Sequence, residues 1–144
     1  MPGQRTLLES FTARGHPNVR SSHETTLEFT KASQLTTRGD CIAGVEASLA
    51  PADFKESTRA ALQSSGAFLL EIRVGNFIEQ VHGHGHPGLS LNDAYEMVFR
   101  KSQYLSGRTV LVSCDKAAMD FDPKMKKVMQ RPGQLIDVAL YKLD

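Results

Sequence analysis

The sequence predicts one domain over residues 1–144, of the α+β class and mainly β, built as an internally duplicated, strand-rich barrel with two helices. The 144 residues are 40% hydrophobic and 23% charged, which is typical of a globular domain. Several segments alternate apolar and polar residues with the period of a strand. The same order of segments occurs twice, in pseudo-repeats of about 6–74 and 76–143. We expect a double-psi or related cradle-loop barrel, because one such unit cannot bury a sheet face alone.

The duplication is predicted from an alignment of the chain with itself. Placing Gly15-His16-Pro17 on Gly85-His86-Pro87 also places Phe29 on Phe99 and Lys31 on Lys101. After a short deletion, residues 66–69 align with residues 133–136. Few residues are identical, but the apolar pattern and the turn residues stay in step. This favours an ancestral duplication over coincidence.

Each half is expected to contain four strands and one helix. The clearest strand is 23–31, where Leu27 and Phe29 alternate with polar residues. A helix is expected to open at Pro51 and another at Asp122-Pro123, since proline suits the first helical turn and aspartate caps it. The other expected strands are 6–14, 40–47 and 67–74 in the first half, and 76–84, 95–101, 109–114 and 135–143 in the second.

Charge and composition exclude several classes of protein. The net charge of +1 gives no general attraction for nucleic acid or an anionic membrane. No apolar run approaches the ~20 residues that cross a bilayer, and the first residues lack the pattern of a signal peptide. Cys41 and Cys114 make no disulfide framework and are expected as buried thiols. We therefore expect a cytoplasmic protein without a membrane partner, and a homo-oligomer is left open.

Several sequence blocks resemble a known family. They are residues 15–19 (GHPNV), 23–31 (HETTLEFTK), 38–42 (RGDCI), 83–87 (GHGHP), 100–102 (RKS) and 115–118 (DKAA). Together they resemble a small family of uncharacterised archaeal proteins, catalogued as a domain of unknown function, over nearly the whole chain. The resemblance implies a cytoplasmic archaeal protein. It implies no activity, cofactor or catalytic residue.

All five histidines lie at or near the two Gly-His-Pro turns. Alternate residues of a strand share one face about 6.6–6.8 Å apart, so His82, His84 and His86 are expected to point the same way, with His16 opposite them. Imidazoles in this arrangement suit zinc or another imidazole-binding divalent metal. The spacing matches no established metal motif, however. Turn histidines bonded to the backbone, or a flexible loop that binds metal adventitiously, are the alternatives.

The leading functional hypothesis is a metal or small-molecule site where the repeats meet, with hydrolysis as one candidate reaction. With a metal, Glu28 or Asp40 would be the general base acting on metal-bound water. Without a metal, His23 or His86 would exchange the proton, because imidazole titrates near neutral pH. Whether the protein is an enzyme is left open by these residues.

Basic residues support an alternative function. Lys31, Arg38, Lys101 and Arg108 occupy matching positions in the two repeats, where a local patch would bind phosphate or nucleic acid without catalysis. The competing interpretation is a solvated surface balanced by nearby acids. Tryptophan is absent, and no aromatic residues are interleaved for base stacking. A purely structural protein is the third possibility.

Overall fold

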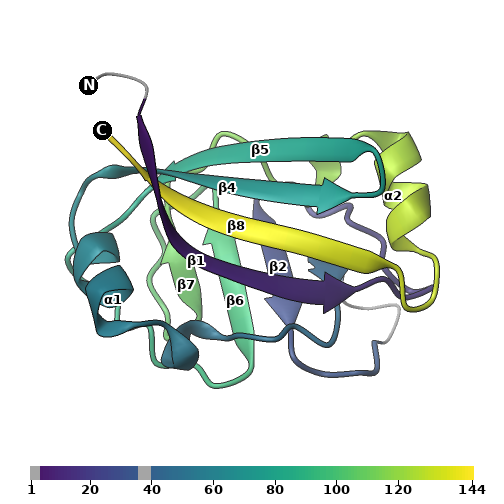
Figure 1. Ribbon diagram of the computed structural model, residues 1–144, viewed down its shortest axis with the longest axis horizontal. Coiled ribbons are helices and arrows are strands. Elements are labelled where there is room, and N and C mark those ends of the chain that lie inside the picture. Colours follow the sequence, from purple (N-terminus) through teal and green to yellow (C-terminus); the bar gives the residue numbers. More distant parts are fainter. Residues whose placement is uncertain (1–3, 36–39) are drawn as a thin grey trace.

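The computed structural model describes residues 4–35 and 40–144, which form two four-stranded sheets packed face to face (Figure 1). Sheet A has the strand order β1-β8-β4-β5, and sheet B has the order β3-β2-β6-β7. The strands of sheet A are β1 (Arg5–Arg14), β8 (Leu135–Leu143), β4 (Ala67–Val74) and β5 (Phe77–His84). Those of sheet B are β3 (Ile42–Gly44), β2 (Thr26–Thr30), β6 (Glu96–Arg100) and β7 (Thr109–Leu111).

The order of elements in residues 5–74 recurs in residues 77–143. Each time, three strands are followed by a 3-10 turn, a helix and a last strand. Each sheet takes two strands from each half, and strands from different halves pair at its centre, β4 with β8 and β2 with β6, both antiparallel. The two halves are therefore interlocked rather than set side by side.

The core lies between the two sheets and follows from the alternation of each strand. Leu27, Phe29, Met97 and Phe99 point inward from β2 and β6 and are essentially inaccessible to solvent. The Phe29 ring contacts the rings of Phe11 and Phe99 edge-on, with centroids 5.5 and 6.4 Å away. These contacts join β1 of sheet A to the centre of sheet B. Residues that alternate with the inward ones, such as Glu28, therefore lie on the outer face.

Two short helices occupy opposite ends of the molecule, α1 (Glu56–Leu62) and α2 (Pro123–Met129) (Figure 1). The predicted N-cap of α2 is confirmed, because the Asp122 carboxylate accepts a hydrogen bond from the Lys124 N–H at 2.8 Å. In the first half, the helix expected to open at Pro51 is split. A 3-10 turn (η1, Pro51–Asp53) comes first, and its counterpart before α2 is η2 (Ala118–Asp120).

The predicted barrel is not formed, although the mainly β character and the two helices are confirmed. The edges of the two sheets meet at single antiparallel bridges, Arg14–Val45 and His84–Val112. Pairing stops there because β3 and β7 have only three residues each and the chain then turns away. Glu46 and Ser113 make these turns with φ of 52° and 51°, outside the range of a strand.

Candidate functional site

The two Gly-His-Pro turns do not face each other across a shared pocket. The His16 N–H donates to the Met129 carbonyl at the end of α2, whereas the His86 N–H donates to the Leu62 carbonyl at the end of α1. Because α1 and α2 lie at opposite ends of the molecule (Figure 1), so do the two turns. The alignment of the sequence with itself pairs these two turns, but the interlocked arrangement of the strands does not bring them together.

The histidine side chains make local contacts. His16 Nδ1 accepts a hydrogen bond from the Asn18 N–H at 3.0 Å, and His86 Nδ1 accepts one from the Gly88 N–H at 2.8 Å. His82 and His84 are exposed on β5, with His82 Nδ1 3.5 Å from the Asp115 carboxylate.

Within residues 4–35 and 40–144, no three or more His, Cys, Asp or Glu side chains are grouped to hold a metal ion. The expected histidine cluster and its zinc site thus find no support. The alternative of backbone-bonded turn histidines describes His16 and His86.

Three of the basic residues expected to bind phosphate, Lys31, Lys101 and Arg108, are paired with carboxylates. Lys31 pairs with Asp53 at 2.6 Å, and Lys101 pairs with Asp120 at 3.0 Å. The antiparallel pairing of β2 with β6 places these two lysines at opposite ends of the pair. Arg108 binds two carboxylates instead, and Arg38 lies outside the described residues. The arrangement gives no concentrated positive patch among these residues.

Glu28 forms the most unusual cluster of titratable groups. It faces Val98 at the centre of the β2–β6 pair, and it is only 4% exposed although it lies on the outer face of sheet B. Arg108 Nη1 donates to Oε1 of Glu28 at 3.0 Å and to Oε1 of Glu96 at 3.1 Å. The Cys41 thiol lies 3.9 Å from the same Glu28 oxygen. One guanidinium thus holds two carboxyl groups together.

The environment of Glu28 favours its neutral form. Burial raises the pKa of Glu28 from 4.5 to about 8, and hydrogen bonding and repulsion from Glu96 act in the same direction against Arg108 and Arg100. Burial and the neighbouring Glu28 raise the pKa of the Cys41 thiol to about 11, and burial raises that of Cys114 to about 12. Glu28 therefore carries a proton near neutral pH, and both cysteines remain thiols.

Two other predicted catalytic residues, His23 and Asp40, lie close to each other. The Ser22 and His23 N–H groups donate to the Asp40 carbonyl at 2.8 and 3.2 Å. His23 and Asp40 line a small surface depression together with Ser22, Glu24 and Thr25.

The same loop is connected to the Glu28 cluster through β2 and Cys41. Thr26 Oγ1 lies 2.9 Å from His23 Nδ1, and the Glu28 N–H donates to the carbonyl of Cys41, the residue after Asp40, at 2.9 Å. His23 and Asp40 thus lie beside the start of β2, and Glu28 lies at the centre of that strand. His86, the other candidate acid–base group, lies at the α1 turn.

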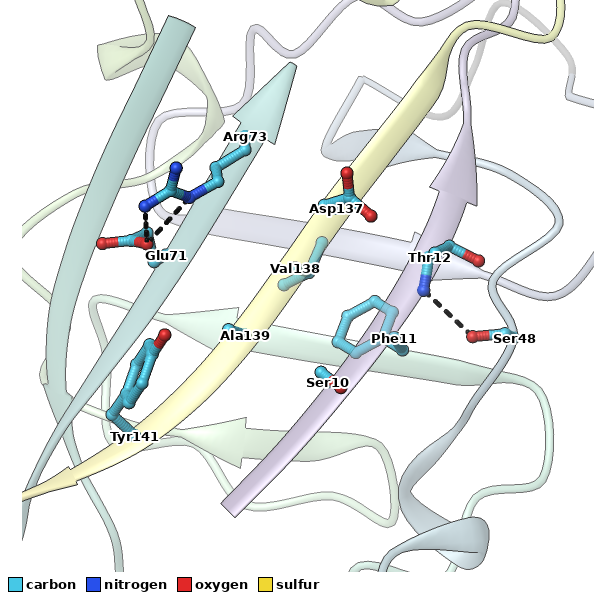
Figure 2. Close-up of a pocket in the computed structure, with 10 residues that line it drawn as sticks. All are labelled: Ser10, Phe11, Thr12, Ser48, Glu71, Arg73, Asp137, Val138, Ala139 and Tyr141. Atoms are coloured by element: carbon cyan, nitrogen blue, oxygen red, sulfur yellow. Dashed lines mark hydrogen bonds and ion pairs between the residues drawn. The ribbon is translucent and has the colours of Figure 1, made fainter. Parts of the chain in front are cut away.

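A second polar site, on the outer face of sheet A, was missed in the sequence. Figure 2 shows it as an open groove across β1, β8 and β4, with Glu71 and Arg73 on one side and Thr12 and Ser48 on the other. Glu71 is 4% exposed, and its carboxylate accepts hydrogen bonds from Arg5, Arg73 and Gln80 at 3.0–3.1 Å. The sequence feature that could have indicated this site is Glu71, the one glutamate inside the mostly apolar segment 67–74. A glutamate is atypical of a buried strand.

The fold and these clusters define a two-sheet protein with polar sites on both outer faces. Residues 11–142 match the family model described as "Domain of unknown function (DUF371)", and the chain belongs to this family. It is 37% identical over 124 residues to an uncharacterised protein of Methanocaldococcus jannaschii, MJ0206, covering 86% of this chain and 92% of the relative. In the described part of the chain, no helix has the length and apolar character that a membrane crossing requires.

Proposed function

We propose that this protein binds a small molecule over the β2–β6 pair and exchanges a proton with it, with Glu28 as the acid–base group. The observation that carries the proposal is the buried Glu28 carboxyl, held against Glu96 by Arg108 where strands of the two halves pair. A carboxyl shifted by desolvation and by a specific charged neighbour is typical of catalytic acids and bases.

Burial makes Glu28 suitable for proton transfer because it raises the pKa of the carboxyl group. A carboxyl with a pKa of about 8 is a proton donor near neutral pH and becomes a proton acceptor after one transfer. Arg108 stabilises the anion left behind, and its side chain is 41% exposed, so a ligand at the surface can reach it. Hydrolysis assisted by a general acid is the reaction class that fits such a group and is the first to test.

His23 and Asp40 would bind or orient the ligand from the adjacent loop. His23 Nδ1 accepts hydrogen bonds from the Thr25 and Thr26 N–H groups at 3.1 Å each, which leaves Nε2 as the nitrogen that carries the proton of the neutral ring. Nε2 is then a hydrogen-bond donor for a ligand in the depression that His23 lines. In this proposal His23 is a binding residue, and Glu28 moves the proton.

We also propose that the two halves descend from a duplicated unit. Supporting this, the bridge from Arg14 to Val45 corresponds to that from His84 to Val112, and the ion pair Lys31–Asp53 corresponds to Lys101–Asp120. On this proposal, Glu28 and Val98 occupy equivalent positions, and only the first half carries a carboxyl group there. The acid–base group would then be a specialisation of one half only.

The proposal is tested in two stages with the Glu28→Gln variant and a matched Glu56→Gln control on the exposed start of α1. In carboxyl NMR titrations, Glu28 should titrate near pH 8, far above an ordinary glutamate. A panel of p-nitrophenyl carboxylic and phosphoric esters is then assayed. Any hydrolysis should be lost in Glu28→Gln and kept in Glu56→Gln. Titration of Glu28 in the ordinary carboxyl range, or activity that survives Glu28→Gln, would overturn the proposal.

A further inference from the structure

The groove on the outer face of sheet A has the dimensions of a ligand site. Its volume is about 300 Å³, which lies at the small end of the range for small-molecule sites. The floor is formed by β8, with β1 and β4 on either side (Figure 2). Polar side chains from three strands and one loop line it, namely Ser10, Thr12, Ser48, Glu71, Arg73, Asp137 and Tyr141.

One side of the groove is held rigidly by Glu71. Its Oε1 accepts from Arg73 Nε and Nη2 at 3.1 and 3.0 Å, and its Oε2 accepts from Arg5 Nη1 and Gln80 Nε2 at 3.1 and 3.0 Å. These bonds fix the Arg73 guanidinium at the groove. Its Nη1 makes no hydrogen bond or ion pair with the described residues, and the side chain is 56% exposed. Arg73 thus presents an oriented cationic donor to solvent.

The middle of the groove contains a carboxylate without a counter-charge. Asp137 is the cross-strand neighbour of Arg73 on one side and of Thr12 on the other. Arg73 turns toward Glu71, so the Asp137 side chain makes no hydrogen bond or ion pair within the described part of the chain. Arg73 and Asp137 are cross-strand neighbours that line the same groove, so the carboxylate and the guanidinium border one ligand-sized space.

We propose that this groove binds a small zwitterion of the amino-acid type, with its ammonium group on Asp137 and its carboxylate on Arg73. An exposed carboxylate and an exposed guanidinium edge on adjacent strands match these two groups in the sign of their charge. Hydroxyl groups of Ser10, Thr12 and Tyr141 supply further hydrogen bonds. The site lies on sheet A and goes beyond the acid–base function proposed for sheet B.

The test uses five probes at equal ionic strength and neutral pH: glycine, β-alanine, methylamine, acetate and glucose. Backbone amide shifts are followed by NMR in the full chain. Glycine or β-alanine should shift the Thr12, Arg73 and Asp137 amides, and methylamine and acetate should bind at least about tenfold more weakly because each satisfies one charge. Asp137→Asn should weaken zwitterion binding about tenfold or more, whereas Glu56→Gln should leave it unchanged.

Each other outcome overturns the proposal. Acetate binding as tightly as glycine would define an anion site at Arg73 alone, and methylamine binding as tightly would define a cation site at Asp137 alone. Glucose as the tightest probe would indicate a polyol site. The absence of shifts with every probe would mean that the groove takes none of these ligands. Asp137 is exposed and unpaired, so Asp137→Asn should fold like the wild type, and its thermal unfolding is measured as a check.

Discussion

Glu28 and Glu71 are both buried carboxyl groups on outer sheet faces, and their pKa values are shifted in opposite directions. Glu71 accepts hydrogen bonds from Gln80, Arg5 and Arg73, which together hold its pKa below the usual value. Glu28 has one guanidinium, shares it with Glu96, and has its pKa raised to about 8 by burial. Both residues are 4% exposed, but burial is the dominant cause at Glu28 and donated hydrogen bonds dominate at Glu71, so the two carboxyl groups have opposite charge states.

The pH dependence of stability should reveal the protonated Glu28. Between its ordinary pKa of 4.5 and its folded pKa of about 8, the folded state keeps a proton that the unfolded chain has released. The free energy of unfolding should therefore fall as pH rises through this window, by about 3 kcal/mol, less than the full conversion of the shift because water reaches one side of the cluster. Urea denaturation from about pH 5 to about pH 9 measures it.

In Glu28→Gln this slope should disappear, since glutamine is neutral throughout, and the variant should be more stable than the wild type above about pH 8. Glu56→Gln should keep the wild-type slope. Parallel pH profiles for wild type and Glu28→Gln would contradict the protonated state of Glu28.

Removing the Glu71 carboxylate should lower the free energy of unfolding. Glu71→Ala leaves Gln80 and two arginines without their shared acceptor, so we expect a loss of roughly 2 kcal/mol near neutral pH, measured by thermal and urea unfolding. Because the pKa of Glu71 is lowered in the folded state, its stabilisation is lost as pH falls through that value. The penalty should shrink in acid. A variant as stable as the wild type at neutral pH would show that the network is dispensable.

Gly15→Ala and Gly85→Ala should destabilise the fold by similar amounts. A Cβ at Gly15 would collide with the Arg131 and Met129 carbonyls, and one at Gly85 with the Leu62 and Ser64 carbonyls. Backbone cannot move aside cheaply, so roughly 2–4 kcal/mol is expected from each change in chemical denaturation. Gly66→Ala is the control, since its nearest neighbour would be Ser64 Oγ at 3.4 Å. Very unequal losses would argue against the equivalence of the two turns.

Asp93 is the structural counterpart of His23, and a substitution based on it can test whether His23 only stabilises the turn or also binds a ligand. Asp93 Oδ1 accepts hydrogen bonds from the Tyr95 and Glu96 N–H groups at 2.9 and 2.8 Å, as His23 Nδ1 does from two equivalent N–H groups. His23→Asp should therefore keep the stability of the wild type, whereas His23→Ala should lose about 1 kcal/mol. Any ligand bound by the imidazole should be lost in both variants. Binding retained by His23→Asp would limit the role of His23 to the turn.

Strand identity could be predicted from the sequence wherever burial alternates along a long segment. The ranges 67–74 and 135–143 match β4 and β8, and Cys114 is buried as expected. β2 and β6 are shorter than expected because the side chains of His23 and Asp93 bind backbone N–H groups that would otherwise join a ladder. Whether a side chain accepts such a hydrogen bond depends on the direction in which it points, and the alternation of apolar and polar residues does not predict that direction.

The candidate site could be predicted only in part, because a similar order of elements in two halves does not specify how the halves meet in space. His23 and Asp40 do lie together beside the start of β2, the strand that carries Glu28. His16 and His86, which were expected to converge, lie at opposite ends of the molecule. Arg108 was assigned to phosphate, yet it binds Glu28 and Glu96. The ion pair between Arg108 and Glu28 forms because strand pairing brings these distant residues together, and the sequence does not predict which strands pair or in what register.

Interlocking has a consequence for how the domain is made. In the described chain, β1 pairs along its length only with β8. Because β8 is synthesised after all the other described strands, β1 cannot pair until β8 has been made. During synthesis the apolar side of β1 has no lasting partner, and neither half can complete a sheet by itself. Both sheets should therefore be completed only once β8 has been made, and the nascent segment would need protection from aggregation until β8 emerges.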